Sequence, residues 1–324
     1  MGIRGRIMKV LITDKMAEEA IQLLKDAGHE VTFNEMDDLT LLKEIPKYDA
    51  LMVRGRTKAV KEIVDAGGQG QLKVIGRAGI GVDNVDIKTA ALHGIPVVNA
   101  PTGSTISVAE LTIGHMLSLS RHLYKADATM KKGEWAKKQL KGIELHGKTL
   151  GLIGCGNIGK ETAKLARAFG MDIIGYDPFL SEAELEEEHI KKIEDLGELM
   201  SKADFISLHL PHNKKTHHIV NKAMIEKMKA SACLINCARG GTVDEQALYD
   251  ALKNGKIAGA GLDVFEQEPP TNNSLLSLDN VMLTPHLGAN TKEGQIRAGT
   301  VCAEQIIKVL NGENADYWVN KKFM

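Results

Sequence analysis

The chain has 324 residues, more than one compact hydrophobic core usually supports, so its length predicts two domains. Its 41 basic and 42 acidic residues leave a net charge of −1, which excludes a general attraction to nucleic acid or to an anionic membrane surface. No apolar run approaches the roughly 20 residues of a spanning helix, and the N-terminus shows no signal-peptide pattern. We therefore expect a cytoplasmic protein.

Short apolar runs alternate with helical patterns through the first hundred residues. The expected strands read KVLIT, VTFNE, DALMVRG, LKVIG and IPVVNA, at 9–13, 31–35, 49–55, 72–76 and 95–100. Because most of these runs are continuously apolar rather than alternating, the strands should form a parallel sheet covered on both faces.

A long uninterrupted helix is expected from about residue 104 to 131, and strand-like runs then begin again. The second set of strands is expected within 148–153, 171–177, 203–211, 231–238, 258–265 and 280–286. A last helix, from about Thr291 to Leu310, has no strand of its own left to pair with. The sequence thus predicts an α/β protein with two Rossmann-like or flavodoxin-like, doubly wound parallel-sheet domains.

A glycine motif marks a candidate dinucleotide site. In GLIGCGNIG (151–159), Gly154, Gly156 and Gly159 follow a predicted strand and, with Asn157 and Ile158, open a predicted helix. Such glycines permit a tight turn and close approach of backbone to a pyrophosphate, and the helix N-terminus offers unpaired N–H groups. The alternative is that they are only turn residues.

An acidic residue strengthens this interpretation. Asp177 ends the next predicted strand and lies 18 residues beyond Gly159, near the distance expected for a carboxylate that accepts hydrogen bonds from an adenosine ribose. A carboxylate there would repel a 2′-phosphate. The sequence therefore favours NAD over NADP.

Three ionisable residues follow successive predicted strands in the same domain: Arg239, Glu268 and His286. Ligands of open α/β sheets bind outside the carboxyl ends of the strands, so these side chains could converge on a nicotinamide. Taken singly, each has an ordinary alternative as a capping ion pair, a solvated loop acid or a hydrogen-bonded core histidine. Their joint position beside the glycine motif favours catalysis.

Neither cysteines nor histidines predict a metal site. The four cysteines (Cys155, Cys233, Cys237 and Cys302) lack paired metal spacing and read as small core hydrophobes. The segment HLPHNKKTHHIV (209–220) contains four histidines, but no nearby carboxylate or cysteine completes a ligand set.

Several long motifs in one order resemble the D-2-hydroxyacid dehydrogenases. They read GRAGIGVDNVD, GLIGCGNIG, INCARGGTVDE, LDVFEQEPP and TPHLGANTKE, and the likeness runs from about residue 9 to 311. The resemblance implies an NAD-binding domain at 101–289, inserted into a discontinuous substrate-binding domain at 1–100 and 290–324. It also implies an active-site cleft between the two domains.

The resemblance further assigns roles to individual residues. Arg239 would hold the substrate carboxylate, His286 would act as general acid/base, and Glu268 would fix and stabilise the protonated imidazole. Asp263 would hold the nicotinamide carboxamide. Other cofactor contacts are implied at Leu210, Pro211, Cys237, Ala238 and Gly288.

The resemblance implies NAD-dependent oxidation of a D-2-hydroxy acid, and we expect this acid to be 3-phospho-D-glycerate. The choice of this substrate depends on the first domain. Arg54 and Arg56 match positions that approach a substrate phosphate in the branch of the family acting on 3-phospho-D-glycerate, although a solvated basic turn is the alternative. The backbone N–H groups of Ala78 and Gly79 would bind the substrate carboxylate, and Arg77 beside them is also expected to bind the substrate.

Two other functions stay open, a glyoxylate or hydroxypyruvate reductase and a dinucleotide-sensing protein like the corepressors of this fold. The resemblance also implies a homodimer built by the long helix and the arm at 133–145. Neither a nucleic-acid partner nor a membrane partner is expected.

Overall fold

The computed structural model describes residues 7–324 and divides into two compact units. Unit 1 contains the residues up to Thr105 together with Ala289–Met324, and unit 2 contains Ile106–Gly288. The start of the N-terminus, where we expect no signal peptide, lies outside the described residues. Within 7–324, no helix is both long enough and apolar enough to cross a membrane.

Unit 1 is built on a five-stranded sheet in the order β2-β1-β3-β4-β5, with every pairing parallel. Its strands are β1 (Lys9–Ile12), β2 (Glu30–Phe33), β3 (Ala50–Val53), β4 (Val74–Arg77) and β5 (Val97–Asn99). Its helices are α1 (Glu18–Asp26), α2 (Asp38–Glu44), α3 (Lys61–Gln69), α4 (Ile87–Leu92) and α12 (Lys292–Leu310), with short 3-10 turns at Ile45–Lys47 and Lys321–Phe323.

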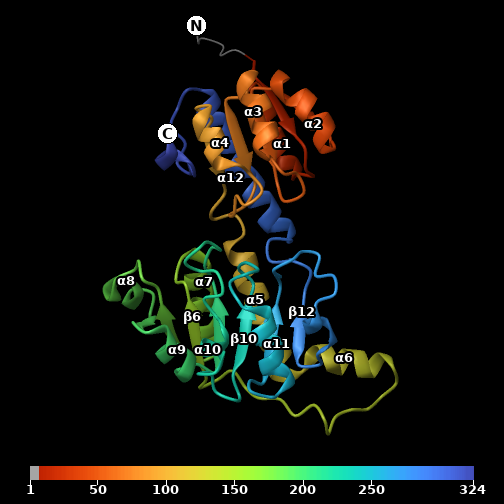
Figure 1. Cartoon of the computed structure of the whole chain (residues 1–324), viewed down its shortest axis with the longest axis vertical. Helices are drawn as coiled ribbons and strands as arrows, with labels where there is room; N and C mark the ends of the chain where they lie inside the picture. Colours follow the sequence, from red (N-terminus) through yellow and green to blue (C-terminus); the bar gives the residue numbers. More distant parts are fainter. Residues whose placement is uncertain (1–6) are drawn as a thin grey trace. The chain divides into compact units, whose positions relative to one another are not determined.

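The last helix, α12, belongs to this unit although it follows all of unit 2 in the chain. It lies beside α1 and β4, so elements from the two ends of the chain share one core (Figure 1). Cys302, Ala303 and Ile306 are fully buried in that core together with Val10 and Val98. The apolar face of α12 therefore substitutes for a helix that the first hundred residues do not supply.

Unit 2 has a seven-stranded parallel sheet in the order β12-β11-β10-β9-β6-β7-β8. The strands are β6 (Thr149–Ile153), β7 (Asp172–Tyr176), β8 (Lys191–Lys192), β9 (Phe205–Leu208), β10 (Cys233–Asn236), β11 (Gly259–Leu262) and β12 (Val281–Leu283). The helices are α5 (Thr105–Arg121), α6 (Leu123–Lys131), α7 (Asn157–Ala168), α8 (Glu182–Glu186), α9 (Leu196–Lys202), α10 (Lys222–Ile225) and α11 (Glu245–Lys253), with a 3-10 turn at Ser274–Ser277.

These two sheets confirm the predicted α/β class with two parallel-sheet domains. In unit 2 the strand order reverses between β6 and β9, which are neighbours in the sheet. At such a reversal the connections leave toward opposite faces, and a crevice opens outside the carboxyl ends of the strands. The strand order therefore predicts that a ligand binds at the loops that follow β6 and β9.

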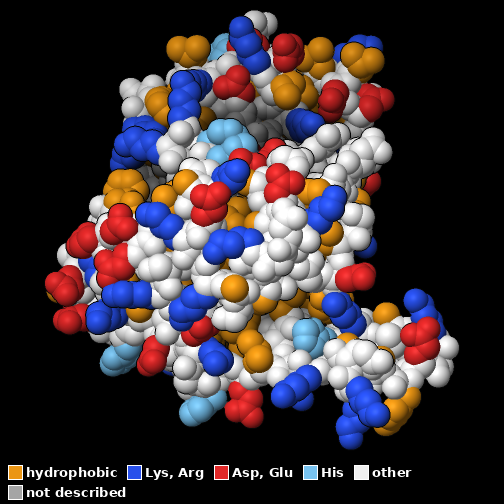
Figure 2. All heavy atoms as spheres, turned by 60° about the horizontal axis from the view of Figure 1, so that its bottom comes forward, with side chains coloured by type: hydrophobic (Ala, Val, Ile, Leu, Met, Phe, Trp, Pro, Cys, Tyr) orange, Lys and Arg blue, Asp and Glu red, His pale blue; other side chains and the backbone are white. Residues whose placement is uncertain are grey.

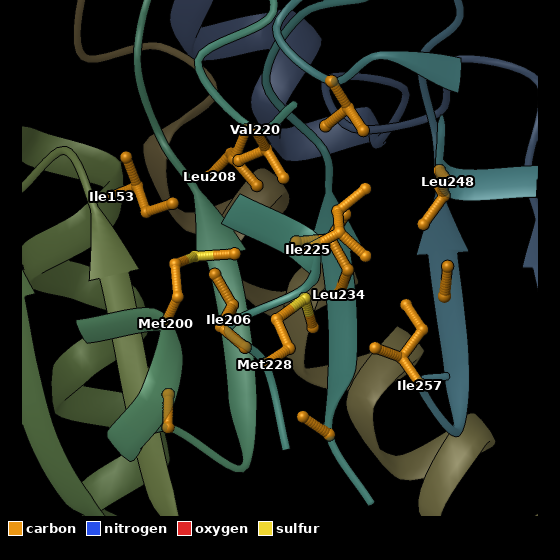
Figure 3. Close-up of a cluster of buried hydrophobic side chains, with 14 of the residues drawn as sticks. Ile153, Met200, Ile206, Leu208, Val220, Ile225, Met228, Leu234, Leu248 and Ile257 are labelled. Carbon is orange, nitrogen blue, oxygen red and sulfur yellow. The ribbon is translucent and has the colours of Figure 1, made fainter. Parts of the chain in front are cut away.

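One face of the unit 2 sheet rests on a continuous apolar cluster. Ile206 and Leu208 of β9 and Leu234 of β10 are fully buried against Met200 of α9 and Ile225 of α10 (Figure 3). Burial of one such side chain stabilises the fold by about 1.5–3 kcal/mol. This packing fixes the strand ends from which the candidate site residues project.

The helix expected to run unbroken from about residue 104 to 131 is in fact two helices, so that prediction is wrong. His122 adopts a left-handed conformation (φ 52°) between α5 and α6. The Ser120 carbonyl, which a continuous helix would use internally, accepts a 2.8 Å hydrogen bond from the backbone N–H of Ile143. A hydrogen bond from the arm at 133–145 thus replaces the one that a continuous helix would form at Ser120.

Candidate active site

The glycine motif forms the loop between β6 and α7. Gly154 has a φ of 93°, and a Cβ there would overlap the carbonyl of His209. A Cβ on Gly159 would likewise overlap the Gly154 carbonyl, whereas the space beside Gly156 is open. The loop is therefore closed toward the protein and open toward the side where a pyrophosphate would approach the start of α7.

Asp177 lies just after β7, beside this loop. Its Oδ2 accepts a 2.9 Å hydrogen bond from the backbone N–H of Cys155, and its Oδ1 accepts one of 2.9 Å from that of Phe179. Each carboxylate oxygen can accept a second hydrogen bond, so the group is held in place and still able to bind ribose hydroxyls. The loop, the helix start and the acid together fit NAD.

Replacing Asp177 should change cofactor preference. Asp177→Asn keeps an acceptor for the Cys155 amide but removes the charge that opposes a 2′-phosphate, so we expect the kcat/KM ratio of NADP to NAD to rise about tenfold or more. Asp177→Ala should in addition weaken NADH binding, as measured by fluorescence titration. Equal kcat/KM for the two cofactors in the unmutated protein would contradict this placement of the carboxylate.

His209 follows β9 and lies against the glycine loop. Its Nε2 is 2.9 Å from the Ser207 hydroxyl, while its Nδ1 is inaccessible to solvent and has no hydrogen-bond partner among the described residues. Burial lowers the pKa of His209 from 6.5 to about 3. The imidazole is therefore neutral and acts as a packing element at the base of the loop.

His209, half-buried with its Nδ1 inaccessible to solvent, predicts an acid-sensitive fold. Because the pKa of His209 is lower in the folded than in the unfolded chain, the unfolded chain binds the extra proton below about pH 6.5, and stability is lost as the pH falls. Between pH 7.5 and 5, the free energy of unfolding should fall by about 2 kcal/mol more in the wild type than in His209→Gln. Urea denaturation across this range measures it, with the exposed His146→Gln as control; equal slopes for wild type and His209→Gln would contradict it.

The remaining histidines of this segment form a chain across the loop after β9. His212 Nε2 lies 3.1 Å from His217 Nδ1, the rings of His217 and His218 stack at 3.9 Å, and His218 Nε2 lies 2.9 Å from Glu266 Oε1. The residues 7–324 contain no group of three or more His, Cys, Asp or Glu side chains arranged to hold a metal ion.

Leu210 and Pro211, two expected cofactor contacts, lie at the start of the same loop. Leu210 is half-buried and Pro211 is exposed.

Glu268 and His286 come together in unit 2. They follow the adjacent strands β11 and β12, and Glu268 Oε2 lies 2.7 Å from His286 Nδ1. The other carboxylate oxygen of Glu268 accepts a 3.2 Å hydrogen bond from the backbone N–H of Phe265. An imidazole that donates through Nδ1 presents Nε2 for proton exchange, and the half-exposed ring allows a substrate to reach it.

Arg239 lies on the turn after β10, at the same edge of the sheet. Its carbonyl accepts hydrogen bonds from Asn236 Nδ2 (3.0 Å) and Thr242 Oγ1 (2.7 Å), which fix the turn. A Cβ on Gly240 would overlap the Phe265 carbonyl, so only glycine lets this turn pack against the segment that leads to Glu268. The carboxyl ends of β10, β11 and β12 thus bring Arg239, Glu268 and His286 to one edge.

The cysteines confirm the core interpretation. All four are free and buried. Burial raises the pKa of each thiol to about 12 and leaves it inert at neutral pH. Cys237 is buried and the adjoining Ala238 is half-buried, and the expected cofactor contacts of both stay predictions.

Asp263 is fully buried, and its carboxylate is engaged inside unit 2. It accepts hydrogen bonds from the backbone N–H groups of Leu287 (2.7 Å) and Gly288 (2.8 Å) and from Thr284 Oγ1 (2.6 Å). These donors flank His286 in sequence. The expected contact with a nicotinamide carboxamide stays a prediction.

In unit 1, Arg54 and Arg56 differ in their surroundings. The guanidinium of Arg56 pairs with buried Asp14 (3.3 Å) and donates to the carbonyls of Thr13 and Met36. The guanidinium of Arg54 makes a longer contact, from Nη1 to the Lys15 carbonyl at 3.4 Å. Burial lowers the pKa of Arg54, Asp14 acts in the opposite direction, and an arginine keeps its charge in proteins.

The expected carboxylate contact in GRAGIG is less open than the motif suggests. The backbone N–H of Ala78 donates to the Val53 carbonyl (2.8 Å), and that of Gly79 donates to the Arg77 carbonyl (2.8 Å). The Arg77 guanidinium lies against Gly79, where a Cβ would overlap it. Substrate binding by these groups stays a prediction.

The chain belongs to the family of D-isomer specific 2-hydroxyacid dehydrogenases. The family model for the NAD binding domain matches residues 113–288, which contain the glycine loop and all three candidate catalytic residues. NAD is therefore the cofactor of this family member, in agreement with the geometry at Asp177.

Three relatives illustrate the similarity. The D-3-phosphoglycerate dehydrogenase of Methanocaldococcus jannaschii is 51% identical over 97% of this chain, which spans 60% of that relative. The hydroxypyruvate reductase of Thermotoga maritima is 50% identical over 93% of this chain and 98% of its own length. The structure of a glyoxylate reductase from Paecilomyes thermophila is similar with a TM-score of 0.88 and 29% identity, covering 98% and 99% of the two chains.

Proposed function

We propose that the chain oxidises 3-phospho-D-glycerate to 3-phosphohydroxypyruvate with NAD, the entry step of serine biosynthesis. The observation that carries the proposal is the 2.7 Å contact of Glu268 with His286, at the edge of an NAD-binding sheet that also presents Arg239. This trio supplies an acid/base and an anion-binding group. The cytoplasmic location stays a prediction.

Each residue has a role in this reaction. Bound NAD supplies the hydride acceptor for the hydrogen on C2. His286 Nε2 takes the hydroxyl proton, and Glu268 at Nδ1 stabilises the imidazolium that forms. Arg239 binds the substrate carboxylate through its planar guanidinium, which orients C2 and its oxygen.

The phosphate is the substrate's second anion, and we assign it to Arg54. The guanidinium of Arg56 is already paired with Asp14, whereas Arg54 follows β3 with one long contact to a carbonyl. Relatives named D-3-phosphoglycerate dehydrogenase support the assignment at up to 51% identity. Lys58 and Lys61, both exposed, add positive charge nearby in sequence.

Reduction of hydroxypyruvate is the second candidate. The relative named hydroxypyruvate reductase is almost equally identical and matches this chain over nearly its full length, whereas this chain spans 60% of the dehydrogenase from M. jannaschii. The chemistry is the same without the phosphate. The two functions therefore differ in how much the phosphate contributes to kcat/KM.

A substrate panel separates these functions. NADH oxidation followed by absorbance with phosphohydroxypyruvate, hydroxypyruvate and glyoxylate should show the highest kcat/KM for the phosphorylated acid. A preference for hydroxypyruvate or glyoxylate would contradict the proposal and favour the reductase. Absence of turnover on every 2-oxo acid would favour a dinucleotide sensor.

The charge distribution gives the sensor little support. On the face shown in Figure 2, Lys and Arg side chains are interspersed with Asp and Glu rather than gathered in one basic field. Binding to nucleic acid usually depends on a basic patch or stripe.

The region after α5 supports the proposed homodimer, which also stays a prediction. Helix α6 contains no buried residue, and Leu123, Met130 and Trp135 are exposed. Exposed apolar groups that gather in one segment commonly mark a contact surface.

A further inference from the structure

A buried histidine outside the proposed catalytic set leads to the His286 loop through hydrogen bonds. His115 lies on α5 and is fully buried. Its Nε2 is 3.0 Å from Thr284 Oγ1, and that hydroxyl is 2.6 Å from Asp263 Oδ1. The ring packs on β11, where a Cβ on Gly261 would come within 2.7 Å of its Nδ1.

The direction of these hydrogen bonds follows from the groups themselves. The Asp263 carboxylate accepts two backbone N–H groups, so the Thr284 hydroxyl donates its one proton to it. That hydroxyl must then accept from His115, which fixes the proton of the imidazole on Nε2. Burial lowers the pKa of His115, with Asp263 acting in the opposite direction, so the ring donates in its neutral form.

Asp263 in turn holds the backbone around His286 through hydrogen bonds. It accepts from the N–H groups of Leu287 and Gly288, which follow His286 directly, while the His286 N–H donates to the Asp263 carbonyl (2.8 Å). His286 itself has a φ of 52°, an unfavourable conformation for a residue with a side chain. A conformation of this kind persists where the surroundings determine it, and here they are Asp263 and Thr284.

We propose that His115 is a positioning residue for the reaction: through Thr284 and Asp263 it holds the 284–288 loop so that His286 Nδ1 faces Glu268. The inference rests on the proposed role of His286. Loss of the Nε2 donor leaves Thr284 free to rotate away from Asp263. The His286 loop then samples conformations without the Glu268 contact, and the fraction of molecules ready for proton transfer falls.

The test compares variants at the two ends of the hydroxyl bridge. His115→Leu removes the donor, whereas His115→Gln can replace it with an amide N–H. Thr284→Val removes the bridge. We expect kcat to fall about tenfold in His115→Leu and Thr284→Val, the NADH dissociation constant and the substrate KM to stay within about twofold, and His115→Gln to recover most of the loss.

Two further readouts distinguish positioning from a merely structural role. The pH profile of kcat should move to lower pH in His115→Leu, because an imidazole without its Glu268 partner binds a proton less tightly. The double variant His115→Leu/Thr284→Val should lose no more than either single variant, since both act through one hydroxyl. Ser120→Ala, a buried hydroxyl of the same helix that bonds to its own turn, is the matched control and should leave kcat unchanged.

A measurement without turnover separates this inference from the proposed function. In protein labelled with ¹⁵N-histidine, the NMR spectrum of the wild type should show the His286 ring as the Nδ1–H tautomer. In His115→Leu it should show exchange between the Nδ1–H and Nε2–H tautomers. An unchanged His286 spectrum in folded His115→Leu, multiplying losses in the double variant, or an equal loss in Ser120→Ala would overturn the positioning role. If the spectrum changes but no 2-oxo acid is turned over, the positioning holds and the proposed function fails.

Discussion

His286→Ala should lower turnover by about 10²-fold or more while the NADH dissociation constant stays within about twofold. In the proposed function the imidazole exchanges the substrate proton, and a positioned acid/base accelerates a reaction by about 10²–10⁴-fold. NADH binding should hardly change, because the His286 side chain is not among the groups that shape the glycine loop. Stopped-flow single turnovers with preformed NADH complex separate the chemical step from product release.

Glu268→Gln is the matched variant for this prediction. It keeps an acceptor near His286 Nδ1 but removes the negative charge 2.7 Å away, so the imidazolium loses its stabilisation. We expect a smaller loss, about tenfold, and a pH profile moved to lower pH, since the neutral base persists to more acidic conditions. His286→Ala reducing the oxo acid at the wild-type single-turnover rate would show that another group donates the proton.

The strands and the motif residues were predictable because their signals are local in sequence. Continuous apolar runs such as those of β6 and β10 are typical of strands buried on both faces, and all the expected runs form strands of two parallel sheets. The glycine loop and Asp177 follow from spacing alone, since each residue's place depends on the strand next to it. Only the two-residue strand β8 was not expected; it is too short to give an apolar pattern.

What the sequence did not reveal are pairings between distant residues. The break at His122 depends on an amide at Ile143, and the partner of Arg56 is Asp14, more than forty residues away. Neither pairing has a composition or a period of its own. The link from His115 to Asp263 likewise joins α5 to the residue that follows β11, and a lone histidine in an apolar helix resembles any core histidine.

The same limit applies to backbone donors. Ala78 and Gly79 follow an apolar strand in a glycine-rich turn, which suggested open N–H groups for a carboxylate. Both amides donate to carbonyls within the unit, and one of those carbonyls belongs to Val53 on the neighbouring strand β3. Register between strands, which decides such bonds, is a property of the folded sheet rather than of the motif.

Arg54→Ala should lower kcat/KM for phosphohydroxypyruvate by about 10- to 100-fold and leave that for hydroxypyruvate nearly unchanged. A charge-assisted hydrogen bond to an anion contributes roughly 1.5–3 kcal/mol, and the unphosphorylated acid has no group to use it. Arg54→Lys keeps the charge but loses the planar guanidinium, so its kcat/KM for phosphohydroxypyruvate should lie between those of the wild type and Arg54→Ala. Initial rates with each substrate at a fixed NADH concentration measure the discrimination.

Arg56→Ala is the control that the structure supplies for this prediction. Its guanidinium is paired with Asp14, whose carboxylate also accepts from the backbone N–H groups of Arg54 and Thr57. Removal of Arg56 should therefore lower the free energy of unfolding by about 1–3 kcal/mol and affect both substrates alike, since it loosens the turn as a whole. Selective loss of the phosphorylated substrate in Arg56→Ala but not in Arg54→Ala would move the phosphate contact to Arg56. Equal losses on both substrates in Arg54→Ala, or a wild type that prefers hydroxypyruvate, would remove the phosphate assignment and favour the reductase.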